Sequence, residues 1–234
     1  MFWFYDYWYI VLVMPAIIFS LITSFSVQAT FDKYARMRSS RGITGAEAAR
    51  RVLDANGLYS VKISSVRGNL TDHYNPRDNT IYLSESVYNN PSTAAIGVAA
   101  HEAGHAVQHA KGYLPIKIRS AIVPVTNFAS KLSLPLILLG LVLEASGWLV
   151  LAYIGVACFA TSTVFQLVTL PTEFNASRRA INALESYGIL SRDELGDAKK
   201  VLSAAAMAYV AALAVSLMQL LRLLLIVGGS NRRR

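Results

Sequence analysis

Long apolar stretches alternate with polar segments along this chain. Residues 9–29 carry no charge, and residues 201–221 form a second uncharged run. Between these runs, residues 120–172 contain only Lys131 and Glu144 as charged side chains and are long enough for two further spans. Because about 20 apolar residues cross a bilayer as a helix, the pattern predicts a mainly α-helical membrane protein with about four transmembrane helices.

The middle apolar stretch is expected to form a helical hairpin. Its helices would cover residues 122–143 and 148–170, with an outer turn at residues 144–147. The last run is expected to give a fourth transmembrane or membrane-associated helix over residues 201–228, followed by a basic tail at residues 229–234. A full crossing would leave this tail outside, against the rule that cytoplasmic segments are the more basic ones.

The polar segment after the first apolar stretch predicts a small α+β unit. Thr44 and Glu47 have the spacing of a helix capping box. Residues 61–66 alternate as a strand does, and the runs 70–74 and 80–83 flank a turn-rich segment, which predicts a β-hairpin. The chain is thus divided into an N-terminal segment with the first transmembrane helix (1–29), the α+β unit (30–119) and the helical hairpin (120–170). A polar segment with Glu173 (171–200), the last apolar helix (201–228) and the basic tail (229–234) follow.

Composition and charge agree with a membrane protein. Hydrophobic residues make up 54% of the chain and charged residues 15%, against about 25% charged in soluble domains. The net charge of +8 comes from basic residues that flank the apolar stretches, so we expect no nucleic-acid partner. The single cysteine, Cys158, excludes an internal disulfide.

The charges around the first apolar stretch predict its orientation. Residues 1–8 are mostly aromatic and contain no Lys or Arg, whereas Lys33 and a series of arginines follow the stretch. This asymmetry places the N-terminus outside and residue 30 onward in the cytoplasm. We therefore expect a multi-pass protein of the cell (inner or plasma) membrane, held by an uncleaved anchor.

A helix predicted over residues 91–111 ends the polar segment. Asn90 can cap it, Pro91 suits its first position and Gly112 follows as a stop. The stretch between them is rich in good helix formers. The candidate chemistry of the chain lies on this helix.

His101, Glu102 and His105 form an H-E-x-x-H motif. Helix positions four apart lie on one face, so both imidazoles can bind the same metal ion. Glu102 beside them can hold a water molecule against that metal. Zinc hydrolases require neutral nitrogen ligands, an open coordination position and a carboxylate base, so the motif predicts a zinc site with Glu102 as the catalytic base.

A catalytic zinc usually has three protein ligands, so a third is expected. His109 lies a further turn along the same helix, too far to share the ion. Glu173, near a helix start predicted at Pro171, is the main candidate, because a helical hairpin returns the chain to the membrane face of the motif. Glu144 would emerge on the opposite face, and Glu85 is a weaker competitor. From the residues alone, Glu173 could equally be an ordinary acid at a helix N-terminus.

The group that stabilises a transition-state oxyanion is left open by the sequence. His73, in the predicted hairpin, is a structural or surface histidine or a transition-state donor. Tyr74, Tyr113 and Arg178 are further candidates.

The order of motifs along the chain resembles a known family. The motifs are TGAEAARR at 44–51, YNP at 74–76, LSE at 83–85, AAHEAGHA at 99–106 and PTEFNASR at 171–178. This arrangement resembles the bacterial membrane neutral zinc metallopeptidases of the YugP type, which are similar in layout to the HtpX and CAAX-protease gluzincins. The resemblance covers nearly the whole chain. It implies one Zn²⁺ per chain, with His101, His105 and Glu173 as ligands and Glu102 as catalytic base.

One position departs from the wider gluzincin pattern. Four residues after the ligand Glu, where Asp is common, this chain has Ser177. Its hydroxyl could hydrogen-bond a ligating imidazole but adds no charge, so zinc affinity could be weaker. Arg178 is a second candidate for a supporting role next to the ligands.

The predicted function is that of a membrane-embedded zinc endopeptidase with its active site at the cytoplasmic face. Its partners would be the lipid bilayer and polypeptide substrates, either membrane-associated or unfolded. The alternative is a non-catalytic zinc-binding membrane scaffold or adaptor. A transporter that uses Lys131 and Glu144 is disfavoured, because the sequence lacks internal repeats and broken-helix signals.

Overall fold

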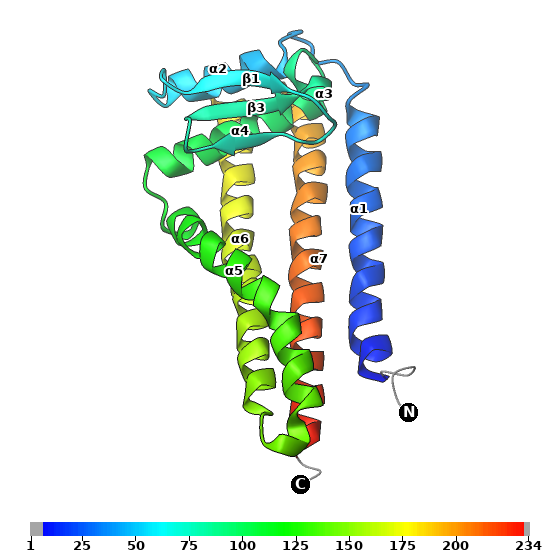
Figure 1. Cartoon of the computed structure of the whole chain (residues 1–234). Coiled ribbons are helices and arrows are strands. Elements are labelled where there is room, and N and C mark those ends of the chain that lie inside the picture. Colours follow the sequence, from blue (N-terminus) through cyan, green and yellow to red (C-terminus); the bar gives the residue numbers. More distant parts are fainter. Residues whose placement is uncertain (1–6, 232–234) are drawn as a thin grey trace. The chain divides into compact units, whose positions relative to one another are not determined.

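The computed structural model describes residues 7–231. Most of the aromatic segment predicted at residues 1–8, and the last three residues of the tail predicted at 229–234, therefore lie outside the described residues. The helices and strands are, in chain order, η1 (Tyr9–Val13), α1 (Met14–Tyr34), α2 (Gly45–Ala55), β1 (Lys62–Val66), β2 (His73–Asn75), β3 (Thr80–Ser84), α3 (Glu85–Tyr88), α4 (Thr93–Ala110), α5 (Leu114–Val142), η2 (Glu144–Ser146), α6 (Val150–Ser186) and α7 (Arg192–Asn231) (Figure 1).

The fold is mainly helical, as predicted for a membrane protein. Within residues 7–231, four helical stretches are long and apolar enough to cross a membrane: Tyr9–Tyr34, Leu114–Val142, Val150–Ser186 and Arg192–Gly229. The chain forms two compact units. The first unit comprises Met1–Thr23, Ile118–Leu170 and Ala208–Arg234, and the second comprises Ser24–Lys117 and Pro171–Met207.

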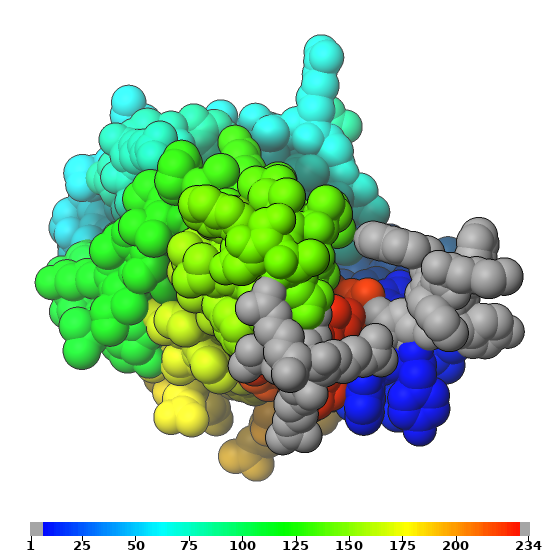
Figure 2. All heavy atoms as spheres, turned by 60° about the horizontal axis from the view of Figure 1, so that its bottom comes forward, coloured from blue at the N-terminus to red at the C-terminus, as the bar shows by residue number. Residues whose placement is uncertain are grey.

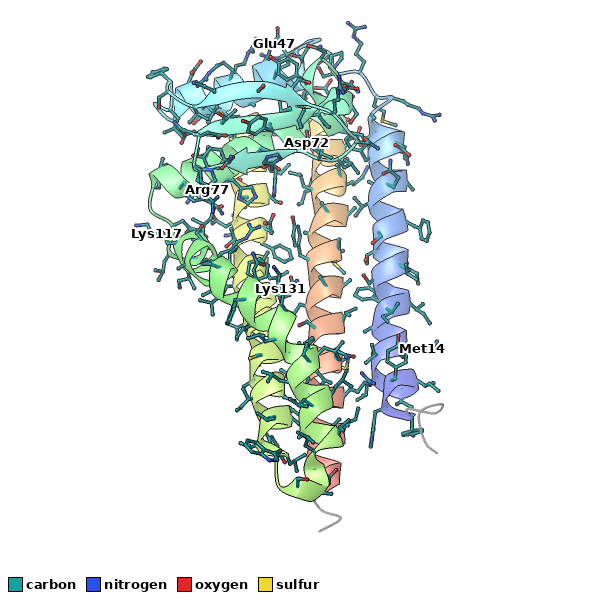
Figure 3. The ribbon with its side chains drawn as sticks, viewed as in Figure 1. Met14, Glu47, Asp72, Arg77, Lys117 and Lys131 are labelled. Carbon is teal, nitrogen blue, oxygen red and sulfur yellow. The ribbon has the colours of Figure 1, made fainter. Side chains whose placement is uncertain are left out.

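The first unit consists of apolar helices whose outward side chains are also apolar. Val142 is 75% exposed and Phe128 is 69% exposed. The turn between α5 and α6, which η2 forms, faces the reader in Figure 2. Lys131, the charge within a predicted span, is an exposed residue of α5 (Figure 3). The interior of this unit contains an aliphatic cluster of Ile137, Leu149, Ala152, Val156, Leu223 and Val227.

The second unit contains a three-stranded sheet in the order β1-β3-β2. β2 and β3 pair antiparallel, with His73 opposite Tyr82, which confirms the predicted hairpin. β1 pairs parallel with β3, with Lys62 opposite Thr80. This parallel pairing was not predicted, and it leaves β2 at an edge of the sheet.

The core of the second unit joins the sheet to α2, α4 and the adjoining parts of α6 and α7. Its largest fully buried apolar side chains are Leu53, Ile81, Leu83, Ile96, Leu184 and Ile189. α2 begins at the predicted capping box, in which the Thr44 side chain accepts from the Glu47 backbone N–H and the Glu47 carboxylate accepts from the Thr44 backbone N–H. The helix ends at Ala55, with Asn56 as its C-cap.

The predicted start of the H-E-x-x-H helix is wrong by two residues. The N-cap of α4 is Ser92, whose hydroxyl accepts from the Ala95 backbone N–H at 3.2 Å. The side chain of Asn90 instead accepts from the Ser92 backbone N–H at 3.0 Å. The Pro91 carbonyl accepts from the Ser39 backbone N–H, so these two residues shape the entry to the helix.

The predicted helix start at Pro171 is also wrong. α6 runs without a break from Val150 to Ser186 and contains Pro171. A proline inside a long apolar helix is tolerated where neighbouring groups satisfy the backbone carbonyls that it frees. The change from apolar to polar composition at this point marks the boundary between the two units within one helix.

Candidate metal centre

α4 brings the residues of the H-E-x-x-H motif together. The centroids of the His101 and His105 rings lie 4.7 Å apart, with an angle of 87° between their planes. The ligand-capable atoms of these histidines and of Glu102 lie within 4.8 Å of one another. His105 and Glu102 are buried, and His101 is partly exposed. One turn of helix thus gathers two imidazoles and a carboxylate in one place.

Glu173 from α6 faces both histidines. Its Oε2 lies 3.2 Å from His101 Nε2 and 3.4 Å from His105 Nε2, and its side chain is 2% exposed. Zinc bonds of about 2.0–2.2 Å in a tetrahedron place neighbouring ligand atoms about 3.3–3.6 Å apart. The distances from the Glu173 oxygen to the two imidazole nitrogens are therefore close to those between ligands of one zinc ion.

Gly104 explains how α6 comes so close to α4. A Cβ at this position would lie 2.8 Å from the backbone oxygen of Ala176, one residue before Ser177. Any larger side chain would push against backbone, which cannot move aside as a flexible side chain can. The glycine inside the motif thus permits the helix contact that delivers Glu173.

A chain of hydrogen bonds fixes the tautomer of His105. The fully buried Gln108 donates from Nε2 to the Thr172 carbonyl at 2.8 Å and to Asn175 Oδ1 at 3.0 Å. Because a carbonyl can only accept, the orientation of this amide is set, and its Oε1 accepts from His105 Nδ1–H at 3.0 Å. Arg179 Nε donates to the same Asn175 Oδ1 at 2.7 Å, which fixes that amide as well. In the neutral imidazole, His105 Nε2 therefore carries the lone pair, as a metal ligand must.

His101 has a different partner. Its Nδ1 lies 3.1 Å from Ser177 Oγ. A hydroxyl can donate or accept, so this contact orients the ring without fixing its tautomer. Ser177 thus occupies the position that the sequence suggested for it, and Gln108 provides the stronger constraint on the other histidine.

The pKa values of His105 and Asp72 are shifted from their ordinary values. Burial alone would lower the pKa of the His105 imidazole, but the Glu173 and Glu102 carboxylates and the Gln108 hydrogen bond outweigh it, so the pKa is raised. Burial raises the pKa of the Asp72 carboxyl, and the negative charge of Glu102 raises it further. Hydrogen bonds from Ser84 act in the opposite direction, but the pKa remains raised. Asp72 lies just before β2, and Figure 3 shows it at the end of the sheet opposite Arg77.

The other sequence candidates lie elsewhere. The His109 ring packs against Tyr74, with centroids 5.5 Å apart. The exposed His73 stacks on Tyr82, and its Nδ1 lies 2.9 Å from the Thr71 carbonyl oxygen. Neither contact points to a metal ligand. Glu85 is exposed at the start of α3, and Glu144 belongs to the first unit.

Arg178 lines a groove formed by residues of α6 and α7. The groove has a volume of about 440 Å³, and Arg178, Lys199 and Ser177 line it together with apolar side chains that include Phe174. Tyr113, a further candidate donor, lies against the guanidinium of Arg179 at 6.0 Å.

Gln108 and Asn175 were missed by the sequence reasoning. Gln108 lies three residues after His105, on the same helix face, so its spacing could have indicated it. Asn175 carried no such local signal, because its partner comes from another helix.

The chain is similar to known membrane zinc proteins. A family model described as "Putative neutral zinc metallopeptidase" matches residues 9–228. "Putative membrane protease YugP" of Bacillus subtilis (strain 168) is 48% identical over 218 residues, which cover 93% of this chain and 96% of that protein. No solved structure matches the chain.

Proposed function

The chain belongs to the neutral zinc metallopeptidase family, and from that premise we propose that it is a membrane-embedded zinc endopeptidase with one metal ion per chain. His101, His105 and Glu173 would hold the zinc, and Glu102 would act as general base. The observation that carries this proposal is the convergence of two Nε2 atoms on one buried carboxylate oxygen at 3.2 and 3.4 Å.

The chain's own residues supply the proton transfers. When bound, zinc supplies Lewis-acid polarisation of the scissile carbonyl and of the attacking water. Glu102 takes a proton from that water as its oxygen bonds to the carbonyl carbon. As the carbon–nitrogen bond breaks, Glu102 passes the proton to the leaving amine. Its 8% exposure limits competing solvent around this transfer.

The edge strand β2 offers a place for an extended polypeptide. Among the strands of residues 7–231, the sheet order leaves one side of β2 without a partner, and β2 contacts α4 in the same unit. A substrate strand could add to this edge through backbone hydrogen bonds. We propose unfolded or membrane-associated polypeptides as substrates. Strand addition depends on hydrogen bonds to the substrate backbone and does not require a particular side chain.

Hydrolysis by a Glu102→Gln variant tests the role of the base. We expect casein hydrolysis to fall by about 10²–10⁴-fold while zinc is retained, because only the proton acceptor is lost. Glu85→Gln is the matched control: it changes an exposed Glu in the same unit and should leave hydrolysis and zinc unchanged. Bound zinc without hydrolysis in the wild type would favour the scaffold alternative.

Ser177 provides a second test of the ligand shell. A carboxylate at this position would accept from His101 Nδ1–H and make the imidazole a more basic ligand. We expect Ser177→Asp to bind zinc at least as tightly as the wild type in a competition titration. Clearly weaker binding would contradict this role for the hydroxyl.

We further propose that the second unit faces the cytoplasm, since Lys33 and the following arginines succeed the first apolar stretch. The exposed Tyr59 allows a direct test. In a Cys158→Ser background, Tyr59→Cys should react with a membrane-impermeant maleimide only after the cells are opened. Labelling of intact cells would place the site on the opposite face.

A further inference from the structure

A basic hollow lies between the end of α1 and the beginning of α7, apart from the metal centre. Its volume is about 600 Å³, and all its lining residues belong to the second unit. The polar residues that line it are Ser26, Thr30, Lys33, Tyr34, Lys199, Lys200 and Ser203. We propose that this hollow binds the phosphate headgroup of an anionic phospholipid.

Three lysines concentrate positive charge on the hollow. Lys33, Lys199 and Lys200 are all exposed along it. Lys200 Nζ lies 3.3 Å from Asp197, which compensates one of the three charges. The ammonium groups of Lys33 and Lys200 lie 5.3 and 5.4 Å from the centroid of the buried Tyr34 ring, so that both are within cation–π range of one side chain.

The hollow has the donors and the space that a phosphate needs. Lysine ammonium groups and the hydroxyls of Ser26, Thr30 and Ser203 are hydrogen-bond donors, and phosphate oxygens are strong acceptors. Gly196 also lines the hollow, and a Cβ added there would meet nothing within 4 Å. The hollow therefore has free space beside Gly196, where a bound group could lie.

The position of the lysines along their helices favours a lipid over free phosphate. On the first helix, the uncharged residues 14–31 lie just before Lys33 in the sequence. On the last helix, the uncharged residues 201–221 follow directly after Lys200. Exposed apolar side chains, Phe25 and Met207, lie on the uncharged side in the same unit. A phospholipid would place its phosphate on the lysines and its acyl chains along these apolar faces.

The test measures lipid retention by the full chain with native mass spectrometry. Protein purified in detergent is titrated with phosphatidylglycerol, phosphatidylcholine or the soluble sn-glycerol 3-phosphate. We expect selective retention of phosphatidylglycerol and at least about tenfold weaker binding in Lys33→Gln/Lys199→Gln/Lys200→Gln. Equal retention of phosphatidylcholine, or equally tight binding of glycerol phosphate, would overturn a lipid headgroup site.

Two control variants separate a local site from net charge and from misfolding. Lys62→Gln/Arg67→Gln/Arg77→Gln removes three exposed cations around the sheet and should bind phosphatidylglycerol as the wild type does. The triple Lys→Arg variant at the hollow should also retain the lipid, because it keeps the charges and the donors. Equal losses in the two Gln variants would show that total charge, and not this hollow, attracts the lipid.

Discussion

The two compact units differ in what they expose and in what they bury. The first unit exposes large apolar side chains such as Phe128 and Val142, and the polar groups that it buries are hydroxyls such as those of Thr163 and Ser216. The second also buries larger polar side chains, an amide and a carboxylate, with Gln108 0% and Glu173 2% exposed. Buried polar groups are tolerated only when they are hydrogen-bonded, and these two have partners within 3.2 Å. The first unit is therefore built for lipid, whereas the second is built to hold polar groups in fixed positions.

A matched pair of lysine substitutions gives the largest expected contrast between the units. Phe128 is 69% exposed in the first unit, and Tyr59 is 74% exposed in the second. Phe128→Lys should reduce membrane insertion by about 3 kcal/mol if its position is lipid-facing and central, because a charge there must leave water. Tyr59→Lys should change stability by less than about 0.5 kcal/mol. If Phe128→Lys and Tyr59→Lys changed membrane insertion and unfolding to the same extent, the distinction between the two units would be wrong.

Adding a methyl group where α4 and α6 touch should disrupt the metal centre. The Gly104→Ala methyl would meet the Ala176 backbone oxygen at 2.8 Å and force the helices apart. Overpacking of this kind costs about 1–3 kcal/mol, so zinc affinity should fall about ten- to a hundredfold. Gly196→Ala, where a Cβ meets nothing, is the control in another helix. Zinc titrations that show no difference between the variants would contradict the packing argument.

Removing the constraint on His105 should have a smaller effect. Gln108→Met keeps a similar length but loses the acceptor for His105 Nδ1–H, so zinc affinity should fall about tenfold. The ¹⁵N shifts of the imidazole should then report a mixture of tautomers in the zinc-free protein. A wild-type tautomer in Gln108→Met would show that the ring is oriented by other contacts.

The smallest predicted effect is the pH dependence of the zinc-stripped protein. The pKa of His105 in the folded state is raised above the ordinary value of 6.5. Its protonation therefore stabilises the fold below about pH 6.5, and this contribution is lost as pH rises through the folded-state pKa. Chemical denaturation should show the free energy of unfolding decreasing over that range in the wild type and less so in His105→Gln. A parallel pH profile in both proteins would contradict the shift.

Much of this architecture could be predicted from periodicity and motifs. The apolar runs predicted the spanning helices, and the i, i+4 spacing placed His101 and His105 on one face of α4. Glu173 was reached by counting membrane crossings, an argument that depends on chain direction and not on local sequence. Its proximity to both histidines then emerged only in three dimensions.

The features that were missed depend on contacts between distant segments. The parallel pairing of β1 with β3 follows from how the hairpin docks on β1, which no local pattern encodes. Ser92 caps α4 because Asn90 and Pro91 are engaged by other backbone groups. Gln108 and Asn175 meet through a helix contact that Gly104 permits, so their role appears only when α4 and α6 are placed together.

The most direct test of the account is the zinc content of Glu173→Gln. This substitution keeps the size of the side chain but replaces the carboxylate that lies against both Nε2 atoms. With purified protein dialysed against a zinc buffer, we predict one zinc per chain in the wild type and in Glu85→Gln, and little or none in Glu173→Gln. A full zinc complement in Glu173→Gln would show that α6 does not supply the third ligand and would contradict the proposed centre.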